Sequence, residues 1–249
     1  MLTHPTLEKL SNLKLTGMLE ALEQQMQSKE IKELSFEERL GMLLDAQDSY
    51  QRNQRFVRRL QQANLRQSAC IEDVDFKHHR CLDKGQLLDL ASGRWIQEHN
   101  NVLISGSTGI GKTYLACALA QMCCREGKRA FYLRLPRLLQ ELAIARADGR
   151  YIRLLANWAR TDLLVIDDFG LSTLSAESTR DLLEVLDDRY NISSTLVSSQ
   201  LPIDDWHKSM EDPTLADAVL DRLIHNAYRI ELEGESIRKK KKIKSGKVK

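Results

Sequence analysis

The sequence predicts an α/β fold in which a mostly parallel sheet is sandwiched by helices, with a small all-α N-terminal domain before it. From about residue 69 onward, short β-rich runs alternate with helical patterns, which is typical of strands joined by right-handed crossovers. These runs are apolar without strict alternation, as expected for strands that are buried on both faces. A chain of 249 residues is long enough for one such domain and a small appendage.

Residues 1–67 are predicted to form the helical N-terminal domain, with a role in partner or DNA contact and in assembly. Apolar residues from Leu7 to Leu22, and again from Phe36 to Leu60, recur at helical spacing. Between Ser49 and Ile71 the sequence has no acidic residue, but it contains the arginines Arg52, Arg55, Arg58, Arg59 and Arg66. Positions 52, 55 and 59 share one face of a helix. This basic stripe indicates either contact with nucleic-acid phosphates or a solvated helix face.

Residues 68–235 are predicted to form the α/β domain. The expected strands are 102–105, 130–134, 163–167, 195–199 and 228–232, and the expected helices lie near 112–126, 136–160, 175–190 and 214–226. Residues 236–249 form a basic tail, because eight basic residues and no acid follow from Arg238 to the end of a chain whose net charge is only +2. Such a tail is expected either to touch nucleic acid or to keep the chain soluble.

Composition argues against a membrane or secreted protein. No apolar run approaches the roughly 20 residues that a helix needs to cross a bilayer. The first 20 residues are charged at several positions and lack the apolar centre of a secretion signal. The five cysteines are odd in number and form no C-x-x-C pair, which suits a reducing compartment. We therefore expect a cytoplasmic protein without a membrane partner.

Residues 106–113 match the pattern G-x-x-x-x-G-K-[ST] between an expected strand and an expected helix. Glycines in such a loop let backbone N–H groups point at phosphate oxygens, and the following helix adds its positive end. Lys112 is expected to reach the β- and γ-phosphates, and the hydroxyl of Thr113 is expected to bind Mg²⁺. The predicted fold is thus a P-loop NTPase, with the nucleotide held by Gly106, Ser107, Thr108, Gly109, Ile110, Gly111, Lys112 and Thr113.

Polar residues follow two further expected strands. Asp167 and Asp168 come after the apolar run 163–166, where Asp167 would hold Mg²⁺ and Asp168 would orient or deprotonate the attacking water. The alternative is that the two acids cap the following turn. Gln200 ends the run 195–199, and it would face the γ-phosphate if that strand lay between the other two. The alternative for Gln200 is an ordinary polar loop start.

Residues 70–238 resemble the IstB/DnaC group of AAA+ ATPases, and within that group they are most similar to the IstB-like helper ATPases of bacterial insertion sequences. The resemblance is carried by the phosphate loop together with four further segments, namely 163–170 (LLVIDDFG), 198–202 with Trp206-His207 after it, 220–223 (LDRL) and 234–238 (GESIR). The phosphate loop alone would not separate this group from other P-loop proteins.

The resemblance implies a role for each matching residue. Lys112 and Thr113 correspond to the Walker A pair, and Asp167 corresponds to the Walker B magnesium ligand. Asp168 takes the place of the catalytic glutamate, and Gln200 that of sensor 1, which is commonly asparagine. The aspartate is one methylene shorter than glutamate and the glutamine is longer than asparagine, so both changes bear on the turnover rate.

Two arginines complete the implied site. Arg222 resembles an arginine finger, which reaches the γ-phosphate bound by a neighbouring subunit. Its alternative is a surface helix residue paired with Asp217 or Asp221. Arg238 is similar to a sensor 2 arginine.

The resemblance also implies the cofactors ATP and Mg²⁺ and an ATPase that is stimulated by DNA. Its partners would be duplex DNA, further copies of the chain in a ring or spiral, and the transposase of the same insertion sequence, which the assembly would recruit and stimulate after remodelling the target DNA. One alternative is a DnaC-like loader of the replicative helicase that acts on single-stranded DNA. Another is a metabolic P-loop kinase, which would need an acceptor pocket and a lid.

Overall fold

The computed structural model describes residues 5–28, 30–76, 81–234 and 236. Arg238 and all but the first residue of the predicted basic tail therefore lie outside the described residues. The chain divides into two compact units, residues 1–58 and 59–249. The division falls inside a long helix and ahead of the boundary expected at residue 68, which stays a prediction.

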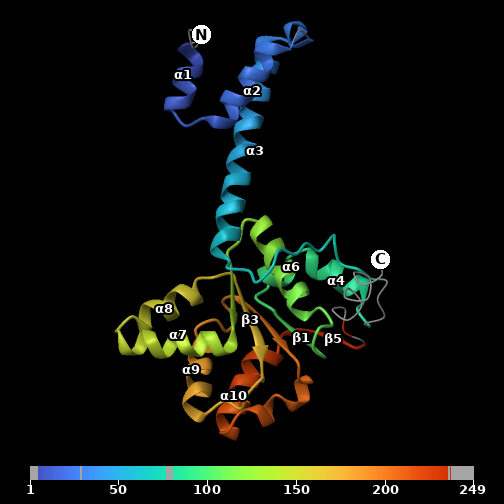
Figure 1. The fold of residues 1–249 in the computed structure, drawn as a ribbon, viewed down its shortest axis with the longest axis vertical. Coiled ribbons are helices and arrows are strands. Elements are labelled where there is room, and N and C mark those ends of the chain that lie inside the picture. Colours follow the sequence, from blue (N-terminus) through green and yellow to red (C-terminus); the bar gives the residue numbers. More distant parts are fainter. Residues whose placement is uncertain (1–4, 29, 77–80, 235, 237–249) are drawn as a thin grey trace, which may run out of the picture. The chain divides into compact units, whose positions relative to one another are not determined.

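The first unit is helical, as the sequence predicts. It contains α1 (Pro5–Asn12), α2 (Thr16–Gln27), a short 3₁₀ helix (Glu30–Glu33) and most of α3 (Phe36–Gln62), all labelled or traceable in Figure 1. A side chain at Gly17 would come within 2.7 Å of the Ala46 carbonyl oxygen and of Tyr50 Cβ. The glycine therefore lets α2 approach α3 closely.

The second unit is built on a five-stranded parallel sheet with the strand order β2-β3-β4-β1-β5. Its strands are β1 (Asn101–Gly106), β2 (Ala130–Arg134), β3 (Leu163–Phe169), β4 (Ser194–Ser199) and β5 (Ala227–Leu232). All five match the predicted strands in place. β4 lies between β1 and β3, so the position that the Gln200 prediction required is confirmed.

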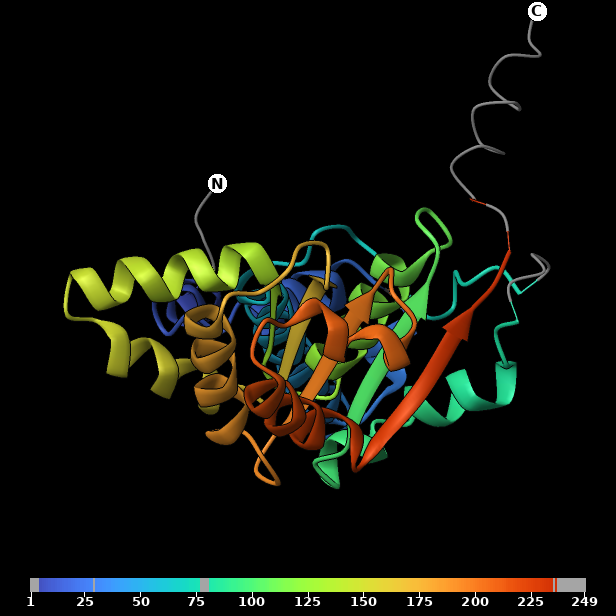
Figure 2. The same ribbon diagram turned by 90° about the horizontal axis from the view of Figure 1, so that it is seen from below.

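Helices cover both faces of the sheet (Figure 2). α6 (Lys112–Arg125) packs on one face, against β1 to β4. On the other face, strand residues such as Leu103, Leu164 and Val197 share one apolar core with the buried sides of four further helices. These are α7 (Leu135–Ala147), α8 (Tyr151–Ala159), α9 (Ala176–Asp187) and α10 (Pro213–Ile224). Because side chains alternate along a strand, each central strand contributes to both layers.

The helix prediction is wrong in two places. The single helix expected over 136–160 is divided into α7 and α8 at Gly149, whose φ of +77° favours glycine. Beside it, the Asp148 carboxylate accepts a hydrogen bond from the Arg150 side chain at 2.8 Å. The sequence analysis also missed α4 (Lys84–Ala91) and α5 (Arg94–Gln97), which come before β1. These helices have only eight and four residues, too few for a clear periodic pattern.

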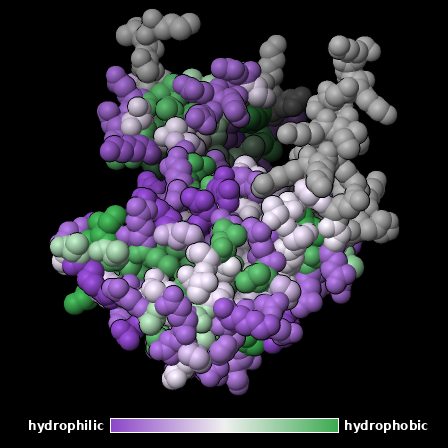
Figure 3. Space-filling view, turned by 60° about the horizontal axis from the view of Figure 1, so that its bottom comes forward, coloured by the Kyte–Doolittle hydropathy of each residue, from purple (hydrophilic) through white to green (hydrophobic). Residues whose placement is uncertain are grey.

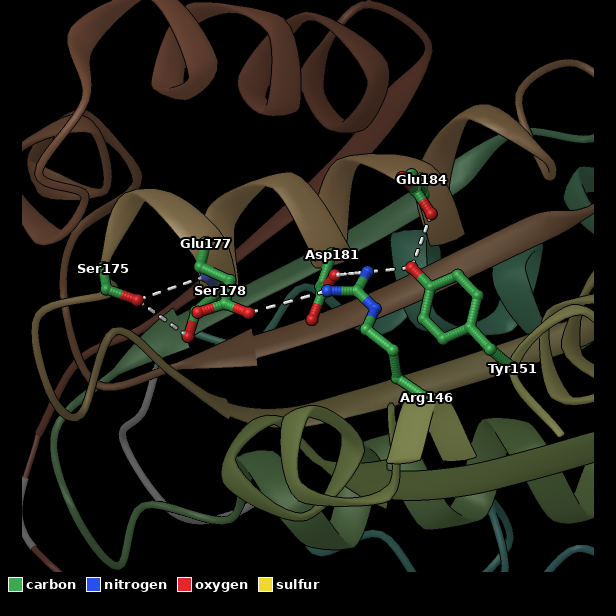
Figure 4. Close-up of polar contacts among 7 residues, drawn as sticks. All are labelled: Arg146, Tyr151, Ser175, Glu177, Ser178, Asp181 and Glu184. Carbon is green, nitrogen blue, oxygen red and sulfur yellow. Dashed lines mark hydrogen bonds and ion pairs between the residues drawn. The ribbon is translucent and has the colours of Figure 1, made fainter. Parts of the chain in front are cut away.

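A polar cluster fastens the α7–α8 pair to α9 (Figure 4). Arg146 on α7 donates to the Asp181 carboxylate at 2.5 Å, and its guanidinium lies 4.5 Å from the Tyr151 ring centre. The Tyr151 hydroxyl on α8 donates to Glu184 at 2.5 Å. Charged and aromatic contacts thus add to the apolar core that holds these helices.

The face of the molecule drawn in Figure 3 is predominantly polar. Figure 3 shows hydrophilic side chains over most of the visible face, with hydrophobic side chains in small separate patches. Among the described residues, no helix is both long enough and apolar enough to cross a bilayer.

Candidate functional site

The phosphate loop joins the end of β1 to the start of α6, so the predicted strand–loop–helix arrangement is present. Its three glycines, Gly106, Gly109 and Gly111, all have positive φ, so none of them can be replaced without strain. Gly106 has φ +142°, and a Cβ there would collide with the carbonyl oxygen of Leu232 on β5. Gly109 has φ +84°, a conformation that residues with a side chain rarely adopt. The loop therefore turns tightly and presents its backbone N–H groups at the start of α6.

Lys112 is the first residue of α6, and its side chain folds back into the loop. Its Nζ donates to the carbonyl oxygens of Gly106 at 2.7 Å and Ser107 at 3.0 Å, and the residue is only 8% exposed. The ammonium group thus lies within the curve of the loop, where it can meet a phosphate oxygen.

Asp167 on β3 accepts more hydrogen bonds than the other acid of the site, and its side chain is 1% exposed. One carboxylate oxygen accepts hydrogen bonds from the hydroxyls of Thr113 at 2.9 Å and Tyr132 at 2.6 Å. The other accepts from the Ser198 hydroxyl and from the backbone N–H of Asp168, the latter at 2.9 Å. Four donors therefore fix the orientation of this carboxylate.

The sequence analysis gave no site role to Tyr132 or Ser198. The signal that could have identified them is a polar side chain within the apolar runs that became β2 and β4, the two strands beside β3. Both point to the α6 side of the sheet, because alternate residues such as Leu133 and Val197 join the core on the other side.

The donor set around Asp167 fits Mg²⁺. The Thr113 hydroxyl and the Asp167 carboxylate are hard oxygen donors that lie 2.9 Å apart, beside the phosphate loop. Magnesium usually takes one or two protein ligands and completes its shell with phosphate oxygens and water.

Asp168 follows Asp167 but has a different backbone. Its φ is +62°, an uncommon value for a residue with a side chain and one that recurs at functional sites. Burial, followed by the negative charge of Asp167, raises the pKa of the Asp168 carboxyl, while the positive charges of Arg66, Arg134 and Lys112 lower it. Its side chain is 19% exposed, so water can reach it.

Gln200 lies at the carboxyl end of β4, next to the phosphate loop. Its side-chain oxygen accepts a hydrogen bond from the Thr108 hydroxyl at 2.6 Å. The structure thus brings together Lys112, Thr113, Asp167, Asp168 and Gln200 at one edge of the sheet, as the strand order requires.

Arg222 lies at the opposite edge of the sheet. Its backbone carbonyl accepts a hydrogen bond from the side chain of Asn101, the first residue of β1, whereas the phosphate loop follows the last residue of that strand. Six strand residues span about 17 Å at about 3.3 Å per residue, which is farther than an arginine side chain extends. Arg222 therefore cannot reach the phosphate loop of its own subunit.

The Arg222 guanidinium is held by nearby residues. It donates to Asp187 at 2.9 Å and to Asp221 at 3.0 Å, and it lies 5.5 Å from the Tyr190 ring centre. Pairing with Asp221 was foreseen as the alternative to an arginine finger; Asp217 instead pairs with His207. The Arg222 side chain remains 33% exposed.

The five arginines predicted to contact DNA do not share one environment. In the first unit, Arg52 pairs with Asp48 at 2.6 Å and Arg55 donates to Gln51 at 3.4 Å, both on the solvent side, and Arg58 is also exposed. In the second unit, Arg59 is half-buried. Arg66 differs from all of these, because its guanidinium lies 3.6 Å from Asp168 and 3.8 Å from Asp167.

Comparison with known proteins identifies the family of the chain. The family described as "IstB-like ATP binding protein" matches residues 8–245. A putative insertion sequence ATP-binding protein of Sinorhizobium fredii is 46% identical over 245 residues, which is 98% of this chain and 100% of the relative. A putative insertion sequence ATP-binding protein of Pseudomonas fluorescens is 47% identical over 203 residues, 81% of this chain and 88% of the relative.

Solved structures agree on the fold. DnaI superposes with a TM-score of 0.58 and 23% identity over 68% of this chain and 92% of its own. The DnaC helicase loader superposes with a TM-score of 0.56 and 19% identity over 66% of this chain and 97% of its own. At such low identity these neighbours establish the P-loop AAA+ fold alone. The family match and the insertion-sequence relatives, which extend over nearly the whole chain, go further: this chain belongs to the IstB-like ATP-binding protein family.

Proposed function

We propose that this chain is an ATP-dependent transposition helper whose copies assemble on duplex DNA, remodel the target and recruit and stimulate a transposase. It is an ATPase of the IstB-like type, and its relatives are insertion sequence proteins. The observation that carries the proposal is the separation of Arg222 from the phosphate loop of the same subunit. A site that needs a second cation would then be completed by another copy.

In this proposal the phosphate loop binds the triphosphate, and Lys112 neutralises charge on its β- and γ-phosphates. Thr113 and Asp167 would hold Mg²⁺, which supplies positive charge to the phosphates when it is bound. Asp168 orients the attacking water and accepts its proton, and Gln200 sets the position of the reacting end of the nucleotide through the loop residue Thr108.

Arg222 acts on the nucleotide of a neighbouring subunit. An arginine that stabilises the developing charge in phosphoryl transfer accelerates the reaction about 10³–10⁵-fold. Contacts that join one subunit's phosphate loop to the opposite edge of the next are heterologous, so they generate a ring or a spiral. Binding of ATP at this boundary would thus favour assembly.

Duplex DNA is the proposed substrate of the assembly. The exposed arginines Arg52, Arg55 and Arg58 offer contacts to phosphates, and Arg59 belongs to the same helix face. Such contacts would make binding tolerant of sequence, with log affinity falling linearly with log salt concentration. The names of the relatives place them in insertion sequences, which supports a transposase as the protein partner.

The test is a pair of titrations with labelled duplex and single-stranded DNA of one sequence, each with a non-hydrolysable ATP analogue and each repeated at several salt concentrations. The proposal expects nucleotide-dependent binding that prefers the duplex and weakens with salt. The Lys112→Ala variant, which should not bind the ATP analogue, serves as the control. A clear preference for single strands would instead support a helicase loader. ATP consumption that DNA leaves unchanged, with transfer of the γ-phosphoryl group to a metabolite instead of to water, would support a kinase.

A further inference from the structure

Arg66 lies outside every motif that identified the nucleotide site, yet it reaches the two acids of that site. It follows the end of α3 and belongs to the same compact unit as the sheet. Its guanidinium Nη1 lies 3.6 Å from an Asp168 carboxylate oxygen and 3.8 Å from an Asp167 carboxylate oxygen. The contact joins residues about 100 positions apart in the sequence, so it depends on the tertiary fold.

The backbone before Arg66 is hydrogen-bonded to β2, the outermost strand of the sheet on that side. The Ala63 carbonyl oxygen accepts a hydrogen bond from the N–H of Tyr132 on β2 at 2.9 Å. Ala63 is fully buried and Ala69 is 2% exposed, so the segment is fixed on both sides of Arg66. The backbone position of Arg66 is therefore fixed, although the Arg66 side chain is 45% exposed.

Tyr132 connects the arginine to the magnesium-ligand acid. Its hydroxyl donates to Asp167 at 2.6 Å. Interaction with the Tyr132 side chain raises the pKa of the Arg66 guanidinium. Arg66, Tyr132 and the two acids thus form one network, in which the arginine is the positive member.

The positive charge of Arg66 offsets the repulsion between the two acids of the site. Asp167 and Asp168 are adjacent in the chain and repel each other, and a bound triphosphate would add more negative charge nearby. Asp168 also has a short side chain on a strained backbone, so its carboxylate needs an external partner to stay in one orientation. Four donors hold Asp167, and the 3.6 Å contact with Arg66 is the ion pair that the structure gives Asp168 among the described residues.

We propose that Arg66 is a positioning residue of the ATPase site, which holds the Asp168 carboxylate in the orientation needed for hydrolysis and acts within its own subunit. The proposal rests on the function proposed above for Asp167 and Asp168. It replaces the DNA contact expected for Arg66 with a role at the nucleotide. It also means that each site uses an arginine from its own chain as well as Arg222 from the next.

The test compares full-length Arg66→Gln and Arg66→Lys with a matched control, Arg125→Gln. Arg125 has a similarly exposed side chain, 48% against 45%, and it pairs with Glu72 away from the two acids. Asp168→Asn is measured in parallel as a check on the role of that acid. The measurements are kcat and KM for ATP, the affinity for a fluorescent non-hydrolysable ATP analogue with Mg²⁺ and with a chelator, and the thermal unfolding midpoint.

Loss of a group that orients another side chain of a metal site typically costs about 10–100-fold in activity, so kcat of Arg66→Gln is expected to fall by about that factor. The KM and the analogue affinity should stay within about twofold of the unaltered protein, because Arg66 reaches the acids rather than the phosphate loop. Arg66→Lys should recover part of kcat, since lysine keeps the charge but not the planar fork. Arg125→Gln should behave like the unaltered protein.

The proposal is overturned if Arg66→Gln hydrolyses ATP as fast as Arg125→Gln does, or faster. It is also overturned if the analogue affinity or the unfolding midpoint falls together with kcat, since that pattern describes a structural role. Full activity of Asp168→Asn would refute the role of the acid itself, and this inference with it. Loss of activity in Asp168→Asn but not in Arg66→Gln would refute this inference alone.

A second measurement separates the nucleotide role from DNA contact. Loss of one phosphate contact lowers the slope of log affinity against log salt by about one. For Arg66→Gln, measured on duplex DNA with the non-hydrolysable analogue, the slope should match that of the unaltered protein. A slope reduced by about one would assign Arg66 to DNA and contradict the proposal.

Discussion

The two edges of the sheet have opposite characters. At the carboxyl ends of the strands, Lys112, Asp167 and Gln200 contact the phosphate loop or its neighbours through short hydrogen bonds. At the amino ends, Arg222 is turned outward on a surface formed with Asp187 and Tyr190. One edge thus holds the residues proposed to bind the nucleotide, and the other exposes an arginine that lies too far away to reach the phosphate loop of its own chain. Under the proposed function, one folded chain carries two halves of a site, which a second copy would join.

The segment after α9, next to Arg222, is held by the buried side chain of Arg189. Arg189 is 1% exposed, and it donates to the carbonyl oxygens of Trp158, Thr161 and Ser194 and to the Thr195 hydroxyl. Burial lowers the pKa of the Arg189 guanidinium to about 9. These bonds fasten the end of α9 to β4 and to the end of α8. Asp187 and Tyr190 flank Arg189 in sequence, so the residues that hold Arg222 rest on a fixed segment.

Loss of Lys112, at the carboxyl ends of the strands, should have the strongest effect on ATP binding. Lys112→Ala should weaken ATP binding by at least about 100-fold, because hydrogen bonds to charged groups contribute about 1.5–3 kcal/mol each. ATP-dependent assembly and DNA binding should be lost with it. Isothermal titration with ATP and sedimentation with duplex DNA measure the two effects, and Lys208→Ala, which alters an exposed pair with Asp205, is the control. Normal nucleotide-dependent assembly by Lys112→Ala would show that the Lys112 side chain is not needed for assembly.

Loss of Arg222, at the amino ends of the strands, should affect hydrolysis and not ATP binding. Arg222→Ala should retain ATP binding but lose hydrolysis by about 10³-fold or more, as expected for an arginine finger. Steady-state hydrolysis measured beside ATP affinity separates the two quantities. Arg229→Ala, at an exposed position on β5, is the control and should hydrolyse ATP normally. If Arg222→Ala turned over ATP at the rate of its control, the second edge would have no part in the reaction.

A smaller effect is expected at Gln200. Replacement by alanine should lower kcat by about 100-fold, as when one preorganised polar group is lost from an active site. Gln200→Asn should retain more activity than Gln200→Ala, because it keeps an amide at the end of β4. Kinetics with ATP as the varied substrate distinguish a change in kcat from a change in KM. Equal activity of both variants and the unaltered protein would show that Gln200 is an ordinary loop residue.

The smallest effect concerns the contact that holds Arg222. Asp187→Ala removes a solvent-exposed ion pair, so the free energy of unfolding should change by less than about 1 kcal/mol. Urea unfolding followed by circular dichroism measures this quantity. Hydrolysis should not fall, because the variant leaves Arg222 itself in place. A loss of hydrolysis comparable to that of Arg222→Ala would mean that Asp187 belongs to the site.

Much of the fold could be predicted because strands buried on both faces leave a clear signal. The runs at β1 to β5 are apolar and bounded by polar residues, so their positions were identified correctly. The break at Gly149 was missed because the apolar spacing continues on both sides of it. The helices α4 and α5 were missed because they are short, and their Leu87, Leu90 and Trp95 are buried by tertiary packing that no local pattern reports.

The site was predicted in part for the same reason. The phosphate loop and the acids after β3 are local patterns with a fixed chemistry, and the strand order then brings them together. Tyr132 and Arg66 could not be assigned to this site from sequence, because their contacts with the acids depend on how β2 and the segment after α3 lie beside β3. A basic stripe is also visible as a pattern of charge, and charge alone does not distinguish a phosphate contact from a contact with an acid.

The proposed function requires that the two edges of the sheet meet between copies, and this can be measured by mixing two inactive variants. Arg222→Ala and Asp168→Asn are each expected to be inactive alone. Mixed in equal amounts before ATP is added, they should regain hydrolysis, since about a quarter of the heterologous interfaces would pair an intact acid with an intact arginine. Asp168→Asn mixed with the double variant that carries both substitutions provides the control, which should stay inactive. Recovery to about a quarter of the unaltered rate is the predicted result, and a mixture as inactive as its components would contradict the claim.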